Sequence, residues 1–229
     1  MRVGVISDVH ANRVALDAVF EDMPDVDALV CAGDVIGYNP WPAACVDALR
    51  ERDVPTVMGN HDRKIATGSN FHGNGMASAG ITHAKRELTD DQAEWVRGLP
   101  RERVLFDGRL KVVHDHPTRR DHYTYPEQFS GDLLEEEDVL VLGHTHVQAH
   151  ETFPEGVVLN PGSVGQPRDG DPRAAYALVE LADGDADKDA DADVTVEERR
   201  VEYDIEAVAD AVRNAGLPES TASRLREGR

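Results

Sequence analysis

Cysteine is nearly absent from this chain of 229 residues, which contains only Cys31 and Cys45. The two residues do not form a CxxC pair, so a disulfide framework and a zinc site built from thiolates are both excluded. Cys31 lies within the apolar segment ALVCAG. We therefore expect it to be a small buried residue without a chemical role.

Long apolar runs are missing as well. The longest of them, residues 174–179 (AAYALV), is far shorter than a membrane span. The N-terminus passes from Met1-Arg2 directly into the strand-like VGVI, with no apolar signal region and no cleavage site. These features predict that no membrane is a partner and that the protein is cytoplasmic.

Positive charge is scarce, because 24 Lys and Arg stand against 44 Asp and Glu and give a net charge of −20. A nucleic-acid backbone is bound by clustered Lys and Arg, so this composition argues against nucleic acid beyond short oligonucleotides. The acidic, lysine-poor surface is typical of a salt-adapted organism, where ions screen the self-repulsion. An ordinary acidic protein is the alternative, and a homo-oligomer is not excluded.

The first sixty residues alternate between predicted strands and predicted helices. We expect strands at 2–6, 27–32 and 54–58 and helices at 12–23 and 41–52. This βαβαβ order predicts an α/β fold with a parallel sheet and helices on its faces. The hydrophobic content of 40% is sufficient for a single core.

The rest of the chain changes character twice. Residues 64–101 are predicted to be a small helical insert, broken at residues 89–91. Strands are then expected at 102–106, 110–114, 138–142, 157–159, 174–181 and 194–203, followed by a helix capped by Asp204. One domain over residues 1–217 and a frayed tail at 218–229 are the expected organisation.

The acidic segment 183–193 has an Asp at every second position. From Asp187 onward its spacing resembles a calcium-binding loop, but Ala192 stands where such a loop needs glycine. Both flanks are predicted strands, whereas a calcium loop of this kind lies between helices. A solvated hairpin loop is therefore the favoured interpretation.

Polar side chains follow five of the apolar segments, at or just past the point where each predicted strand ends. They are Asp8 and His10, Asp34, Asn60 with His61 and Asp62, His114, and His144 with His146. In open α/β sheets this edge is where binding sites form. Oxygen and imidazole ligands without a thiolate suit Mn, Fe, Zn, Co or Ni.

The joint order D-x-H, GD, GNHD, H and GHTH resembles that of the calcineurin-like metallophosphoesterases, and most closely their short prokaryotic-type phosphodiesterases. The similarity extends from Arg2 to Leu217 and includes the segment NPGSVGQPRDGDPRAAYAL at residues 160–178. The resemblance implies a four-layer α/β/β/α sandwich. It also implies a hydrolase that acts on a small phosphodiester or phosphomonoester.

The resemblance implies a centre of two divalent metal ions, with Mn as the common activator. One ion would take Asp8, His10, Asp34 and His146, and the other Asp34, Asn60, His114 and His144. Asp34 would bridge them, because a carboxylate offers two oxygens. His61 would face the substrate as a proton donor or electrostatic stabiliser, with Asp62 orienting it.

Two cations about 3.5–4 Å apart can activate a bridging hydroxide for in-line attack on phosphorus. The presence of all the matching positions favours an enzyme of this kind. Two alternatives remain open. One is a non-catalytic metal-binding scaffold or interaction protein of the same fold, and the other is a nuclease acting on short oligonucleotides.

Two departures from the family pattern concern the substrate side. The family usually has DxHGN, but Ala11 stands in the glycine position, which we expect to require a negative φ. The usual His-Gly is replaced by His114-Asp115-His116. Asn12, Asp115 and His116 are candidate substrate contacts. The alternative is that Asp115 and His116 point away from the site.

Other histidines and arginines have weaker signals. His122 and Tyr123 belong to the same atypical stretch and are candidates to line the pocket. Arg168 and Arg173 could meet a substrate phosphate, but paired surface charges are the favoured interpretation. The histidines without motif support are expected at the surface: His72, His83 and His150.

Overall fold

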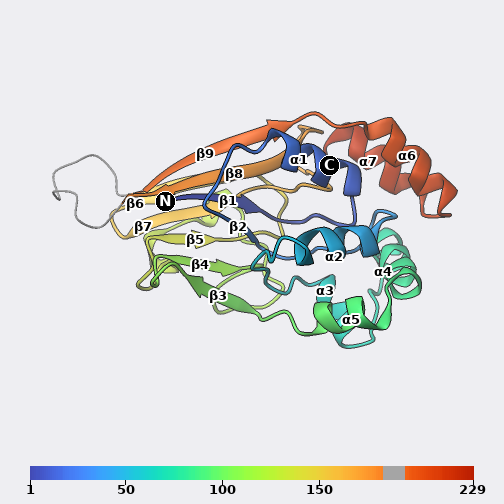
Figure 1. The fold of residues 1–229 in the computed structure, drawn as a ribbon, viewed down its shortest axis with the longest axis horizontal. Coiled ribbons are helices and arrows are strands. Elements are labelled where there is room, and N and C mark those ends of the chain that lie inside the picture. Colours follow the sequence, from blue (N-terminus) through green and yellow to red (C-terminus); the bar gives the residue numbers. More distant parts are fainter. Residues whose placement is uncertain (183–193) are drawn as a thin grey trace.

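Two β-sheets form the centre of the molecule in a computed structural model that describes residues 1–182 and 194–229 (Figure 1). The first sheet has the strand order β2-β1-β8-β9 and the second the order β3-β4-β5-β7-β6. The strands are β1 (Arg2–Ile6), β2 (Ala28–Cys31), β3 (Glu102–Leu105), β4 (Leu110–Val113), β5 (Val139–Val141), β6 (Ala149–Phe153), β7 (Gly156–Asn160), β8 (Ala174–Leu181) and β9 (Val194–Val201). Both sheets mix parallel and antiparallel pairs.

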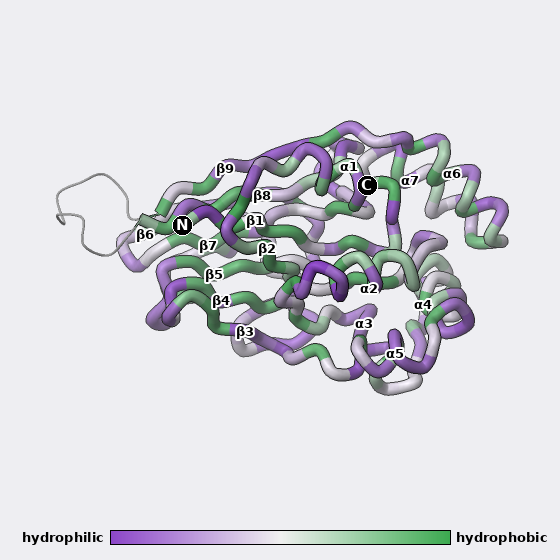
Figure 2. Tube along the Cα trace, in the orientation of Figure 1, coloured by the Kyte–Doolittle hydropathy of each residue, from purple (hydrophilic) through white to green (hydrophobic). Residues whose placement is uncertain are grey.

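An apolar layer joins the two sheets. Val3 and Val5 of β1 point into it from the first sheet, and Val139 and Val141 of β5 from the second. These residues are two positions apart because alternate side chains of a strand share a face. Figure 2 shows the inner strands β1, β4 and β5 as mainly hydrophobic.

Helices α1 (Arg13–Asp22) and α2 (Pro42–Arg50) pack on the other face of the first sheet. Leu16 of α1 and Leu49 of α2 share a buried cluster with Tyr176 of β8. The corresponding layer over the second sheet consists of two short 3₁₀ turns, Pro126–Gln128 and Gly131–Leu133, rather than α-helices. The predicted α/β fold with two packed sheets is confirmed.

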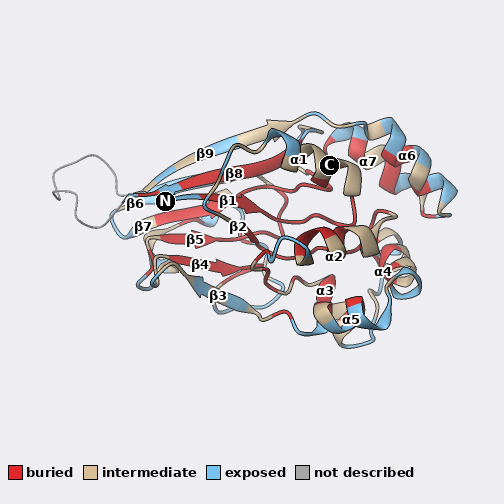
Figure 3. Ribbon diagram, in the orientation of Figure 1, coloured by how far each residue is buried: buried red, intermediate tan, exposed pale blue. Residues whose placement is uncertain are grey.

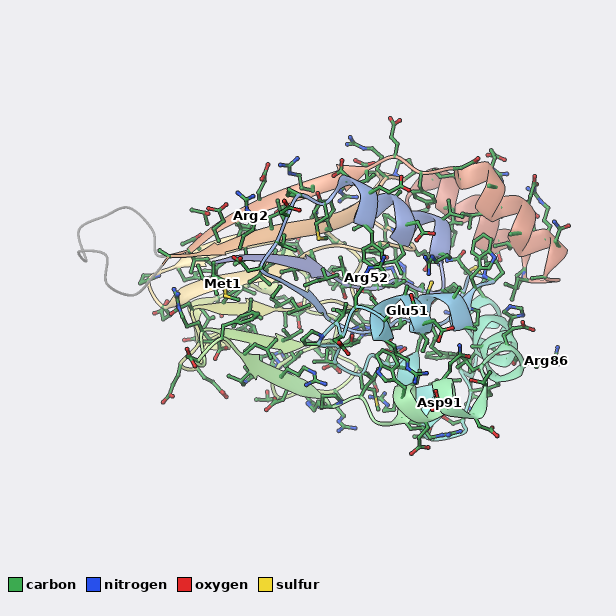
Figure 4. All side chains as sticks on the ribbon, viewed as in Figure 1. Met1, Arg2, Glu51, Arg52, Arg86 and Asp91 are labelled. Atoms are coloured by element: carbon green, nitrogen blue, oxygen red, sulfur yellow. The ribbon has the colours of Figure 1, made fainter. Side chains whose placement is uncertain are left out.

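The insert contains α3 (Asp62–Ala66), α4 (Gly75–Glu87) and α5 (Asp90–Arg97). The predicted break lies at Thr89, whose side chain caps α5 together with Gln92. Figure 4 shows Arg86 at the outer edge of this part of the molecule, and the carboxylate of Asp91 pairs with Arg50 at 2.7 Å. The insert therefore presents charge to solvent and apolar residues such as Ile81 to the core.

The C-terminal residues are helical, which corrects the expectation of a frayed tail. Helix α6 (Ile205–Asn214) packs against α7 (Glu219–Glu227), and Ala222 and Leu225 of α7 are completely buried. The sequence offers little sign of this helix, because its apolar face is narrow and its other positions are polar.

Two strand assignments also differ from expectation. Residues 54–58 form only one bridge, between Thr56 and Cys31, because Pro55 has no N–H to extend the ladder. Strand β6 was not predicted, since its sequence AHETF has no apolar alternation and is largely exposed. Its His150 lies at the surface, as predicted, with Nδ1 2.7 Å from Glu198 Oε1.

Burial is concentrated in the inner strands, and Figure 3 shows β1, β4, β5 and β8 mainly buried while β3 and β9 are of intermediate burial or exposed. Among the described residues, no helix is both long and apolar enough to cross a membrane. The acidic segment 183–193 lies outside the described residues. Its interpretations as a calcium loop or a solvated hairpin therefore stay predictions.

Candidate metal centre

The five predicted strand-end segments come together at one edge of the two sheets. Their histidines and aspartates form three overlapping groups whose ligand atoms lie within 4.8 Å of one another in each group. The groups are Asp8, His10 and His146; His10, Asp34 and His61; and Asp34, His114 and His144. All of these side chains are buried, and none is more than 4% exposed.

The first group is held around Asp8. Its Oδ1 lies 3.1 Å from His146 Nε2 and 3.5 Å from His10 Nε2, and the two imidazole Nε2 atoms are 3.1 Å apart. The Oδ2 of Asp8 accepts hydrogen bonds from Ser7 Oγ at 2.6 Å and from the backbone N–H of His144 at 3.0 Å. One oxygen is thus fixed by the protein and the other faces the two imidazoles.

Asp34 lies between the groups. Its Oδ2 is 3.6 Å from His10 Nε2 and 3.4 Å from His114 Nε2. The Oδ1 of Asn60 is 3.2 Å from the same His114 nitrogen. The Asp34 carboxylate therefore lies between His10 of the first group and His114.

Backbone carbonyls orient three of the imidazoles. His10 Nδ1 lies 3.1 Å from Ile36 O, His114 Nδ1 2.7 Å from Ala32 O, and His146 Nδ1 2.5 Å from Gln166 O. A carbonyl can only accept, so each Nδ1 carries the proton and each Nε2 is left as a ligand atom facing the centre.

Burial and neighbouring charges set the protonation of the centre. Burial lowers the pKa of His144 to about 4 and that of His146 to about 3, so both imidazoles are neutral at pH 7. Burial opposes charge on Asp8 and Asp34, but the surrounding histidines outweigh it and hold the pKa of both carboxyls below the usual range. Two carboxylates and neutral imidazoles are a ligand set ready for a cation.

His114 has the opposite shift. Burial disfavours its charged form, but attraction to Asp34 is stronger and raises the pKa of His114 to about 10. In the described residues, the buried Nε2 of His144 has no hydrogen-bond partner. The extra proton of His114 and the unpartnered nitrogen of His144 both belong to side chains grouped with Asp34. Both features suit a site where a divalent metal ion displaces the proton and binds the nitrogen atoms.

His61 lies beside the candidate ligands. Its backbone N–H donates to Asp34 Oδ1 at 2.8 Å, and its ring centroid is 4.7 Å from those of both His10 and Tyr38. Phe71 covers the ring from another side at 4.6 Å. Burial lowers the pKa of His61, and in the described part of the chain its Nδ1 has no partner.

The carboxylate of Asp62, expected to orient His61, contacts backbone N–H groups. Its carboxylate accepts the backbone N–H groups of Val35, Ile36 and Gly59 at 3.3, 3.3 and 3.0 Å. No hydrogen bond joins it to the His61 ring within residues 1–182 and 194–229. Asp62 therefore connects the loop after Asp34 to the segment that contains Asn60 and His61 through these hydrogen bonds. It orients His61 only through the backbone.

The ligand loops have unusual backbone conformations. Six of their non-glycine residues have φ between 46° and 68°: Asp8, His10, Ala11, Asp34, His144 and His146. Each left-handed residue costs roughly 1–2 kcal/mol. Ala11 has φ 54°, so the expectation of a negative φ was wrong. Hydrogen bonds between the loops, such as Ala11 N–H to Val35 O at 2.8 Å, hold the strained backbone in place.

Two glycines allow close approach around the centre. A Cβ on Gly143 would lie 2.2 Å from Ser7 Oγ and 2.9 Å from Asp8 Oδ2. A Cβ on Gly37 would lie 2.4 Å from His61 Nδ1. The glycine of GHTH is therefore needed for packing against Asp8, and Gly37 for the position of His61.

The predicted substrate contacts have partners within the protein. Asn12 is fully buried, accepts from Ala15 N–H as the cap of α1 and donates to Gly165 O. Asp115 accepts from the N–H groups of His116 and Asp121, and His116 contacts Arg119. A direct role of Asn12, Asp115 or His116 in substrate binding stays a prediction.

The surroundings of the centre include predicted pocket residues and two aromatic residues that the sequence analysis did not identify. Tyr123, a predicted pocket residue, stacks on His144 at 4.0 Å, and the His122 ring lies 5.3 Å from that of His116. Tyr38 and Phe71 were missed, because an isolated aromatic residue has no motif. Arg173 pairs with Asp171 as predicted.

Arg168 was favoured as a paired surface charge, yet its guanidinium instead contacts Tyr38 Oη at 3.2 Å and Gln166 Oε1 at 2.8 Å. His72 is exposed, while His83 is half-buried with Nε2 3.0 Å from Pro40 O.

Comparison with known proteins agrees with this geometry. Residues 1–184 match the model of the calcineurin-like phosphoesterase superfamily domain. The chain belongs to this superfamily. The crystal structure of a metallophosphoesterase from Sphaerobacter thermophilus is 33% identical, with a TM-score of 0.82 over 100% of this chain and 99% of that one. The fold is thus a metallophosphoesterase fold.

Two curated proteins are also similar. Protein MJ0912 of Methanocaldococcus jannaschii is 28% identical over 99% of this chain and 98% of its own length. Phosphodiesterase YfcE of Escherichia coli is 29% identical over 79% of this chain and 88% of its own length. Membership of the superfamily and the buried Asp-His groups together identify the residues of this centre as candidate metal ligands.

Proposed function

We propose that this protein is a metal-dependent phosphoesterase that hydrolyses a small phosphodiester or phosphomonoester at a centre of two divalent cations. The observation that carries the proposal is the position of Asp34, whose Oδ2 lies within 3.6 Å of His10 Nε2 on one side and 3.4 Å of His114 Nε2 on the other. A shared carboxylate between two imidazole groups suits a pair of ions.

The proposed ligands divide into two sets around Asp34. Asp8, His10 and His146 with Asp34 would hold one ion, and Asn60, His114 and His144 with Asp34 the other. Mn is the preferred metal, and Fe, Zn, Ni and Co suit the same nitrogen and oxygen ligands. When bound, such ions neutralise phosphoryl charge and lower the pKa of water.

His61 belongs to neither of the two proposed ligand sets, and we assign the catalytic role to it. Its ring is buried and its centroid lies 4.7 Å from that of His10, so one ring N–H can donate a hydrogen bond to the oxygen of the leaving group, and the protonated ring could transfer its proton there. Tyr38 and Phe71 exclude water from its ring. Asp62 and the close approach of Gly37 keep the segment in position.

The test is Mn-stimulated hydrolysis of bis-p-nitrophenyl phosphate by wild type and His61→Gln. We expect the substitution to lower kcat by about 10²–10⁴-fold, the usual contribution of a positioned acid. His150→Gln is the matched control, because His150 lies at the surface with its Nδ1 2.7 Å from Glu198 Oε1. Its kcat should equal that of wild type.

Two results would oppose the proposal. Equal activity of wild type and His61→Gln would remove the catalytic role of His61. Wild-type protein that binds metal but is inert with Mn, Fe, Zn, Ni and Co would favour the alternative of a non-catalytic scaffold or interaction protein. Cleavage restricted to short oligonucleotides would favour the nuclease alternative. The cytoplasmic location, the salt-adapted origin and a homo-oligomer stay predictions.

A further inference from the structure

Helix α7 lies beyond residues 1–184, the part of the chain that the superfamily model matches. Its C-terminal end packs on the loop that carries Arg168. The backbone N–H of Gly170 donates to Gly228 O at 2.9 Å, and a Cβ on Gly228 would lie 2.7 Å from the carbonyl carbon of Asp171. Figure 1 shows α7 at the same end of the molecule as the loop that follows β1.

Arg224 lies one helical turn before Gly228. Residues four positions apart share a face of a helix, so Arg224 lies on the side of α7 that meets the Arg168 loop. Its side chain is half-buried, and its Nε donates to the carbonyl of Arg229. Burial and repulsion from Arg168 lower the pKa of Arg224, while Tyr38 and Tyr123 oppose this shift.

Arg168 connects this face of α7 to the metal centre. Its backbone N–H donates to His146 O at 3.2 Å, and its guanidinium contacts the hydroxyl of Tyr38 at 3.2 Å. The Tyr38 ring in turn lies 4.7 Å from the rings of His10 and His61. The Nε of Arg168 is buried and has no hydrogen-bond partner in the described residues.

Neither arginine pairs with an Asp or Glu side chain in the part of the chain that the structure describes. Arginines elsewhere on the surface pair with carboxylates at 2.6–2.7 Å, for example Arg63 with Asp121, Arg226 with Glu206 and Arg50 with Asp91. Arg168 and Arg224 form no such pair, although the chain has 44 acidic residues. Two neighbouring guanidiniums without an Asp or Glu partner are suited to a phosphate group.

We propose that Arg168 and Arg224 together bind a second phosphate group of the substrate, so that α7 completes the substrate site and favours esters that carry at least two phosphates. This inference rests on the proposed function and names its substrate class. The phosphate that reacts would lie at the Asp-His centre. The second phosphate would lie beyond Tyr38, at the side chains of Arg168 and Arg224.

The first test measures binding without catalysis. Inorganic pyrophosphate is titrated calorimetrically into metal-free protein, with inorganic phosphate as the single-phosphate comparison. We expect pyrophosphate to bind more tightly, and Arg168→Gln and Arg224→Gln each to weaken it by about tenfold, as for the loss of one charge-assisted hydrogen bond. Arg226→Gln is the matched control on the same helix and should bind as wild type does.

The second test measures the preference of the Mn-loaded enzyme for ADP over AMP as competitors of bis-p-nitrophenyl phosphate hydrolysis. Arg224→Gln should lower this preference about tenfold, and Arg224→Lys, which keeps the charge, should lower it less. Thermal unfolding shows whether each variant is folded. If Arg224→Gln does not fold, the measurements on Arg224→Lys and Arg168→Gln test the inference instead.

Equal pyrophosphate affinity in wild type, Arg168→Gln and Arg224→Gln would overturn the inference, as would an equal loss in Arg226→Gln. Failure of the proposed function is distinguishable from this result. An enzyme inert towards bis-p-nitrophenyl phosphate would refute the activity, while the binding of pyrophosphate to metal-free protein would still report on the two arginines.

Discussion

The Asp-His centre and the rim around it are built in different ways. The centre is buried, with its aspartates and histidines no more than 4% exposed, and backbone carbonyls orient three of its imidazoles. The rim comprises Tyr38, Tyr123, Arg168 and Arg224, which come from four separate segments, and Tyr123 is 44% exposed. Strand ends thus position the candidate metal ligands, while in the proposal above the loops and α7 select the substrate.

Among substitutions that replace neither a ligand nor the proposed catalytic His61, the largest effect is expected from Gly143→Ala, which disturbs the centre. The new Cβ would lie 2.2 Å from Ser7 Oγ and 2.9 Å from Asp8 Oδ2, so the Asp8 carboxylate must move. A misplacement of about 1 Å costs roughly 10²-fold in rate. The measurement is kcat/KM for bis-p-nitrophenyl phosphate with Mn.

Gly75→Ala is the control for this substitution, because nothing lies within 4 Å of its added Cβ. It should retain wild-type activity. If Gly143→Ala were fully active, the tight packing of GHTH against Asp8 would have no functional importance.

A smaller effect concerns the pH dependence of metal binding at the centre. The raised pKa of His114, about 10, means that the metal-free imidazole is protonated at pH 7, and an incoming cation must displace this proton. Mn affinity should therefore rise with pH, by up to about tenfold per pH unit between roughly pH 7 and pH 9. Calorimetry in buffers of different ionisation enthalpy measures the proton released. Binding without proton release would show that His114 is already neutral.

The smallest effect is expected at the rim from Tyr123→Leu, which removes the ring stacked 4.0 Å from His144. Such a stack contributes about 0.5–1.5 kcal/mol, so KM should rise by roughly two- to tenfold while the number of bound metals stays the same. Tyr125→Leu is the control, since Tyr125 stacks only on Tyr123, at 6.0 Å. A loss of bound metal in Tyr123→Leu would mean that the ring belongs to the centre.

Much of the centre could be predicted from the sequence, because strand ends carry their polar residues to one sheet edge. Asp34 and His114 are 80 positions apart, yet both directly follow apolar strands, and the structure brings them to 3.4 Å. The left-handed φ of Ala11 could not be predicted, because hydrogen bonds from distant segments impose it. Arg168 was misjudged for the same reason, since its neighbours Tyr38 and α7 are remote in the chain.

The central claim is that Asp34 joins two metal sites, and counting the metal ions bound per chain tests it most directly. Mn bound after dialysis is measured for wild type, Asp34→Asn and the control Asp138→Asn, whose Asp138 only pairs with Arg109 near the surface. The account predicts about two ions per chain for wild type and the control, and at least one fewer for Asp34→Asn. A single ion in wild type, or an unchanged count in Asp34→Asn, would contradict it.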